Sequence, residues 1–185
     1  NMREQILSWG GEVHFNARVD QLLLEKDEII GVTCADGREF LSEAVILAIG
    51  HSARDTFEML EQKQIPMEAK SFAVGLRVEH PQALINLSQY ADEWPEQLPP
   101  ASYKLTAKTE EGRGVYSFCM CPGGYVVNAS SEEGRLAVNG MSYSRRDGKN
   151  ANSAIIVAVT PADYGSDHPL AGIEFQRGLE QRAYE

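Results

Sequence analysis

The stretch AVILAIGHSARDTF, residues 44–57, decides the fold class that the sequence predicts. Its first six residues, 44–49, are all apolar, a pattern typical of a strand buried on both faces. Gly50 follows at once, and then a helical apolar spacing begins, with Ser52 and Asp55 at capping-box distance. A strand that ends at a glycine and turns into a helix exposes backbone N–H groups where open α/β sheets hold cofactors. The spacing fits a plain tight turn equally well.

Before this stretch, the sequence predicts a short helix and antiparallel strands. Residues 2–9 have helical spacing and end at Gly10 and Gly11. Apolar residues alternate from Val13 onward, and the pair Asp36-Gly37 is typical of a tight hairpin turn, which needs a positive φ. Two or three antiparallel strands therefore lead up to the strand at 44–49.

After this stretch, Pro66 and the loss of helical spacing over 64–70 predict a domain boundary. Short apolar strands separated by glycine turns then predict a mostly antiparallel sheet, with a central strand near the end and a last helix. The fold class predicted is mixed α+β, with domains at 1–65 and 66–185. The expected elements of the second domain are strands at 71–80, 101–109, 114–122, 124–130, 134–140 and 152–161, helices at 81–90 and 169–185, and a surface loop at 94–100.

The segment FCMCPGGYV, residues 118–126, is the densest candidate for chemistry. On a regular strand Cys119 and Cys121 point the same way, and Pro122, Gly123 and Gly124 predict a turn beyond them. Buried cysteines are also common as small apolar residues. A dithiol redox site is disfavoured because its usual spacing is C-x-x-C, and no histidine pair completes a zinc site, so no metal is predicted.

A polar segment over residues 139–155 predicts a loop, which is where many functional side chains lie. Its candidates for hydrogen bonds to a polar or anionic substrate are Asn139, Ser142, Arg145, Arg146, Asn150 and Asn152. A solvated connection without function fits the same composition.

Composition excludes several classes of partner. The formal net charge of -10 argues against a nucleic acid or an anionic membrane surface, because both require a basic surface. Three cysteines, no signal peptide and no apolar membrane span lead us to expect a cytoplasmic protein.

Three segments resemble one family: GHSARDT at 50–56, FAVGLRVEHPQ at 72–82 and FCMCPGG at 118–124. They are similar to segments of FAD-dependent dehydrogenases, also called NAD(FAD)-utilising dehydrogenases. The resemblance implies FAD as cofactor, an FAD-dependent oxidoreductase activity on a small-molecule substrate, and an inserted substrate domain at 66–185. The site residues implied are Ile49, Gly50, His51, Ser52, Pro122, Gly123 and Gly124 for FAD, Cys119 and Cys121 for catalysis, and Asn139, Ser142, Arg145 and Asn152 for substrate.

The G-x-G-x-x-G turn that holds the pyrophosphate in such flavoproteins is not found in this sequence. We therefore expect residues 1–65 to be part of an FAD-binding domain, and the chain to be the middle piece of a longer enzyme. Its partner would be the rest of that domain, and the piece alone would bind FAD weakly and be inactive. The alternative is a stand-alone module that binds a ligand or protein without redox activity.

Overall fold

The computed structural model describes residues 1–91 and 97–185 and divides into two compact units, Asn1–Ile65 and Pro66–Glu185. Both units combine helices with antiparallel strands, so the predicted α+β class is confirmed. The surface loop expected at 94–100 lies partly outside the described residues. That the units are an FAD-binding and a substrate domain stays a prediction.

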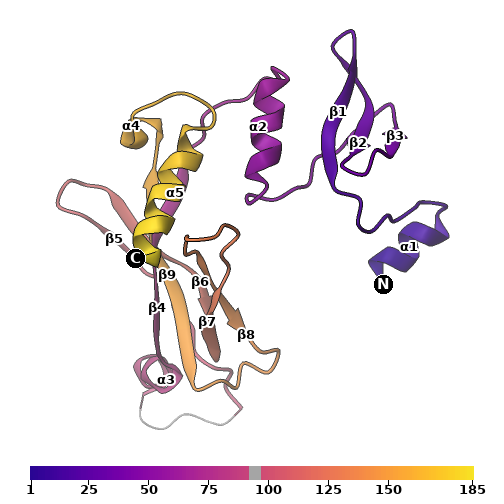
Figure 1. Ribbon diagram of the computed structural model, residues 1–185. Helices are drawn as coiled ribbons and strands as arrows, with labels where there is room; N and C mark the ends of the chain where they lie inside the picture. Colours follow the sequence, from indigo (N-terminus) through magenta and orange to yellow (C-terminus); the bar gives the residue numbers. More distant parts are fainter. Residues whose placement is uncertain (92–96) are drawn as a thin grey trace. The chain divides into compact units, whose positions relative to one another are not determined.

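Unit 1 contains a three-stranded antiparallel sheet in the order β1-β2-β3 and two helices (Figure 1). The first helix starts with a capping box in which Asn1 and Glu4 satisfy each other's backbone N–H groups. The hairpin predicted at Asp36-Gly37 is present, and Gly37 has a φ of 85°. The elements are α1 (Met2–Ser8), β1 (Val19–Glu25), β2 (Glu28–Cys34), β3 (Glu39–Leu41) and α2 (Arg54–Gln62).

The buried strand predicted at 44–49 is not found. This segment has no strand partner among the described residues, and Ile46 is 90% exposed. Apolar content predicts burial, but burial on both faces needs covering strands and helices. The described part of unit 1 supplies no such cover, because β1, β2 and β3 pair only with one another.

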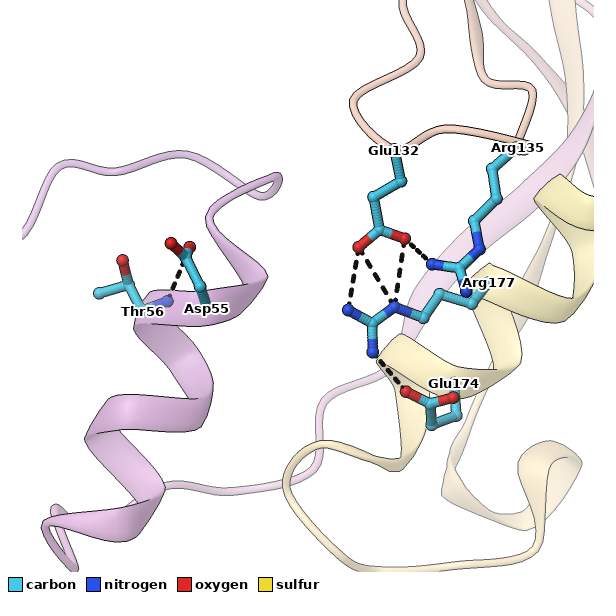
Figure 2. Close-up of polar contacts among 6 residues, drawn as sticks. All are labelled: Asp55, Thr56, Glu132, Arg135, Glu174 and Arg177. Carbon is cyan, nitrogen blue, oxygen red and sulfur yellow. Dashed lines mark hydrogen bonds and ion pairs between the residues drawn. The ribbon is translucent and has the colours of Figure 1, made fainter. Parts of the chain in front are cut away.

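The capping box predicted for Ser52 and Asp55 is also not formed. Helix α2 begins at Arg54 with Ala53 at its N-cap position, so Ser52 lies one residue too early to cap it. The Ser52 hydroxyl instead lies 3.2 Å from His51 Nδ1. The carboxylate of Asp55 accepts a hydrogen bond from the Thr56 N–H at 2.9 Å (Figure 2).

Unit 2 is built on a four-stranded antiparallel sheet in the order β4-β9-β6-β5, with a second, two-stranded sheet of β7 and β8. Strand β9 is central, as its apolar sequence predicts. The elements are β4 (Phe72–Pro81), α3 (Gln82–Tyr90), β5 (Thr106–Lys108), β6 (Gly114–Cys121), β7 (Gly124–Asn128), β8 (Val138–Ser142), β9 (Asn150–Val159), α4 (Pro161–Tyr164) and α5 (Ala171–Tyr184).

The C-terminal helices pack beside the start of β4. The ring of Phe72 stacks on Tyr164 of α4, with ring centroids 5.8 Å apart, and meets Phe175 of α5 edge-on at 6.2 Å. Helix α4 was not predicted, although Thr160 and Asp163 form a capping box around Pro161. Among the described residues, every helix is too short or too polar to cross a bilayer.

An ion-pair cluster holds the loop between β7 and β8 against α5 (Figure 2). The Glu132 carboxylate accepts from Arg177 at 2.9 Å and also from Arg135, while Arg177 pairs with Glu174 on its own helix. The Leu136 N–H donates to the Glu180 carbonyl at 2.9 Å. The two half-buried arginines of this cluster therefore both have a carboxylate partner.

Candidate functional site

The two cysteines of β6 lie at a β-bulge. Phe118 stands opposite Ala154 and Cys121 opposite Asn152, so β6 has one more residue than β9 between these pairs. The extra residue places Cys119 in the left-handed region, with a φ of 47°. The same-side orientation expected for Cys119 and Cys121 assumed a regular strand, and the bulge interrupts that strand between Phe118 and Cys121. Cys119 is exposed and Cys121 is half-buried.

The side chain of Arg77, on β4, holds the bulge through hydrogen bonds. Its Nη1 and Nη2 donate to the Cys119 carbonyl at 3.2 and 3.1 Å, and Nη1 also donates to Asn152 Oδ1 at 2.7 Å. The guanidinium is half-buried, and it forms no ion pair with any residue that the structure describes. Among the described residues, its hydrogen-bond acceptors are thus neutral oxygens.

Asn152 is 0% exposed and lies on β9, which agrees with the strand predicted at 152–161 and not with the loop predicted over 139–155. The side chain of Asn152 orients Arg77, and its Nδ2 has no hydrogen-bond partner in the described part of the chain. Gly140 of β8 packs directly on this pair, since a Cβ there would overlap Asn152 Oδ1 and Arg77 Nη1. Sheet β7-β8 therefore approaches Arg77 closely only because residue 140 is glycine.

The turn at Pro122, Gly123 and Gly124 is buried and fixed by other elements. Gln82, the first residue of α3, accepts from the Gly123 N–H at 2.8 Å. The Ser142 hydroxyl donates to the Pro122 carbonyl at 2.7 Å. A Cβ at Gly123 or Gly124 would overlap the carbonyl of Arg146 or Met141, so protein packing already explains both glycines.

The structure brings some of the predicted substrate residues together and separates another. Asn139, Ser142 and Asn152 are strand residues, because the loop spans only 143–149 between β8 and β9. Asn139 lines a pocket with Arg77 and Cys119. Arg145 is exposed in the loop and is not part of that pocket.

We call this cavity the Arg77 pocket. Its volume is about 220 Å³, and strands β4, β6, β8 and β9 contribute to its walls. Arg77, Ala154 and Phe118 stand opposite one another on three neighbouring strands, and direct partners share a sheet face. Ala154 is the small central member of this row, and Gly75 in the next row has no side chain. The hollow beside the guanidinium therefore follows from the sequence of these strands.

Sequence reasoning missed Arg77 and Gln82. The sequence pattern predicts a strand at Arg77 and a helix at Gln82, and no role in a site for either residue. Their partners lie 42 and 41 residues away in the sequence. The one local signal was a cation on the polar face of an alternating strand, which is too common on half-buried strands to single out a site.

In unit 1, the predicted FAD residues Ile49, Gly50, His51 and Ser52 form an exposed, irregular segment. Gly50 has a φ of 70°, and the space where a Cβ would stand is open. Backbone groups at this glycine can therefore be approached closely by a ligand. The other predicted FAD residues, in the turn after the cysteines, lie in unit 2.

A hollow of about 1040 Å³ also lies in unit 1, beside β2 and residues 41–45. Carboxylates of Glu25, Asp27, Glu28 and Glu43 line it together with apolar residues. These charges repel a pyrophosphate, so the hollow does not fit FAD. The described residues also contain no group of three side chains that could hold a metal ion.

Sequence comparisons show which known proteins this chain resembles. Residues 71–185 match the family model described as FAD-dependent protein, C-terminal domain-like. An uncharacterized protein of Clostridium beijerinckii is 50% identical over 187 residues, which cover 100% of this chain and 35% of that protein. The chloroplastic prolycopene isomerase of Arabidopsis thaliana is 31% identical over 74 residues, 39% of this chain and 12% of that enzyme. The chain thus spans about a third of the first relative's length.

Proposed function

The chain belongs to the family of FAD-dependent proteins with this C-terminal domain, and from that premise we propose that it is part of an FAD-dependent oxidoreductase of the dehydrogenase type. The observation that carries the proposal is the family match over 71–185, which contains the strained, exposed Cys119 and the Arg77 pocket. Unit 2 would supply the substrate side of the active site. Unit 1 would supply part of the wall against the flavin nucleotide.

The exposed apolar segment at 44–49 supports this role for unit 1. An apolar run with Ile46 90% exposed is stable only when something covers it. We propose that strands from the rest of an FAD-binding domain pair with this segment. Pairing there would turn it into the buried strand that its sequence favours, with Gly50 at its end and the open backbone facing FAD.

FAD, when bound, supplies the ring that takes up hydride from the substrate. The chain itself would position reacting groups and exclude water from the active site. Arg77 holds the Cys119 carbonyl, and Gln82 holds the buried turn that follows, so the backbone that carries the Cys119 thiol is fixed at the pocket rim. A side chain held in this way needs little reordering when substrate binds.

The test uses the protein made from the complete reading frame that contains residues 1–185. We expect it to purify with the visible absorbance of flavin. Gly50→Val, which forces a β-branched residue into a φ of 70°, should weaken FAD binding about tenfold, or about 1.4 kcal/mol. Gly112→Val is the matched control, since Gly112 has a φ of 84° and equally open surroundings in the turn after β5.

Absence of flavin from the full-length protein, or equal FAD affinity in the Gly50 and Gly112 variants, would contradict the proposal. The role of the cysteines is tested in the same protein. Cys119→Ser should slow flavin reduction by substrate while leaving the FAD content unchanged. Cys121→Ser is the comparison, because that thiol is half-buried and donates to the Cys119 carbonyl at 3.3 Å.

A further inference from the structure

Arg77 differs from the other half-buried arginines of unit 2. Arg135 and Arg177 both pair with the Glu132 carboxylate (Figure 2). Within the described residues, Arg77 has only the Cys119 carbonyl and the Asn152 amide oxygen as acceptors. A guanidinium has five N–H donors, and these contacts leave its Nε–H without a protein acceptor in the described ranges. A partly buried cation without a counter-charge is poorly compensated.

A second observation concerns Asn152, which is fully buried. Its Oδ1 is occupied by Arg77, while its Nδ2 has no hydrogen-bond partner within residues 1–91 and 97–185. Burying an amide donor without an acceptor is unfavourable, because the donor loses its hydrogen bond to water. Among the described residues, Asn152 Nδ2 is therefore a buried donor beside Arg77 that no protein acceptor matches.

The nearest acidic residue along β4 does not neutralise Arg77. Glu79 lies two residues further along the same face, and its two carboxylate oxygens accept from the Val126 N–H at 2.7 Å and from Asn150 Nδ2 at 2.6 Å. Its hydrogen bonds thus hold β7 and the start of β9. The cationic side of the pocket stays open to an anion.

The volume and the lining residues of the pocket limit which anions can bind there. A volume of about 220 Å³ is below the range of roughly 300–1,000 Å³ that encloses drug-sized ligands, so it holds a small molecule or one end of a larger one. Phe118, 56% exposed, and Ile156 contribute apolar surface, and Asn139 adds a polar side chain at the rim. A planar carboxylate matches the fork of a guanidinium.

We infer that the Arg77 pocket binds the carboxylate of a small organic acid, with the acid's short apolar part against Phe118 and Ile156. The inference deepens the proposed function by naming a substrate class. Only the statement that the acid is a substrate rests on the proposed function. Binding itself requires no flavin, so the two can fail separately.

Cys119 provides a direct readout, because its exposed thiol lines the pocket. In the full-length protein with Cys121→Ser, the rate of Cys119 alkylation is compared for iodoacetate and neutral iodoacetamide, with the site of modification read by mass spectrometry. In both reactions the sulfur displaces iodide. A carboxylate bound by Arg77 should make iodoacetate about tenfold faster, with saturation, and butyrate but not butyramide should protect Cys119.

Arg77→Gln should abolish the preference for iodoacetate, and Arg77→Lys should keep part of it. Arg182→Gln removes the same charge from an exposed site on α5 and should change nothing. Equal rates of the two reagents in the unsubstituted arginine background, or a preference that survives Arg77→Gln, would overturn the inference. Protection by sulfate as strong as by butyrate would overturn the assignment to carboxylates. Flavin content, measured on the same samples, reports separately on the proposed function.

Discussion

Gln82 Oε1 accepts the hydrogen bond of the Gly123 N–H at 2.8 Å, across 41 residues of sequence. The same side chain, 6% exposed, donates through Nε2 to Asn86 Oδ1 and to the Ala101 carbonyl. One buried amide thus connects α3, the segment before β5 and the turn after the cysteines. The shape of the turn therefore depends on a hydrogen bond to a side chain that lies outside the turn.

Replacement of Gln82 by leucine should destabilise the protein by about 3 kcal/mol, because the Gly123 N–H and the Ala101 carbonyl lose a buried partner at about 1–3 kcal/mol each. Urea denaturation measures the loss. Gln181→Leu is the control on exposed α5 and should stay within about 0.5 kcal/mol. Equal losses in the two variants would show that Gln82 does not hold the turn.

Two glycine-to-alanine substitutions should change the free energy of unfolding in opposite directions. Gly140→Ala places a Cβ against Arg77 and Asn152 and should cost about 1–3 kcal/mol, while reducing the iodoacetate preference of Cys119. Gly178→Ala in α5 meets open space and should stabilise the protein by up to about 1 kcal/mol. Thermal unfolding of both variants checks the signs, and a neutral Gly140→Ala would refute the close packing of β8.

The left-handed backbone at Cys119 predicts an order of stability among its variants. Cys119→Val should lose about 1–2 kcal/mol because a β-branched residue is disfavoured at a φ of 47°, whereas Cys119→Gly should be as stable as the parent or more so. Cys121→Val is the comparison, because Cys121 pairs with Asn152 and does not have a positive φ. If Cys119→Val and Cys119→Gly unfold at the same urea concentration, the bulge is not as described.

Glu79 predicts an acid dependence of stability. Hydrogen bonds from the Val126 N–H, and then from Asn150, hold the pKa of Glu79 below its ordinary value. A lowered pKa means that the folded state binds this proton less readily than the unfolded chain. The stabilisation is therefore complete above the ordinary pKa of about 4.3 and is lost as the pH falls through the lower, folded value.

The free energy of unfolding of the parent should thus exceed that of Glu79→Gln by more at neutral pH than in acid below that window. Denaturation curves of both proteins across the acid range give this difference, and the variant cancels the contribution of other carboxyl groups. Glu133→Gln, at an exposed site in the loop before β8, serves as the surface control. A parent-to-Glu79→Gln difference that grows in acid would contradict the sign.

Local patterns predicted local elements well. Asp36-Gly37 specified a hairpin because glycine accepts the positive φ that the turn needs, and the apolar run of β9 indicated a central strand. The segment at 44–49 shows the limit of the same reasoning. Its composition favours burial on both faces, but burial depends on partners that a single strand's sequence does not describe.

The candidate site was predictable only in part. Cys119 and the glycine turn stand out as a dense, unusual segment, and Asn139 and Asn152 stand out as polar residues. The bulge at Cys119 has no local signature, and the roles of Arg77 and Gln82 come from contacts more than 40 residues apart. Such contacts depend on which strands become neighbours, and strand spacing in the sequence leaves that order open.

The strand order β4-β9-β6-β5 also has a consequence for synthesis on the ribosome. Strand β4, complete at Pro81, can pair only when β9, complete at Val159, has left the exit tunnel. At rates of roughly 5–20 residues per second, the delay is about 4–16 s. During that time β4 has two open edges in a growing chain, and β6 and β5 can form no more than a hairpin. The first strand of unit 2 therefore stays unpaired until its last strand has been synthesised. Slow translation between the two strands would lengthen the time during which β4 is exposed to chaperones and to neighbouring nascent chains.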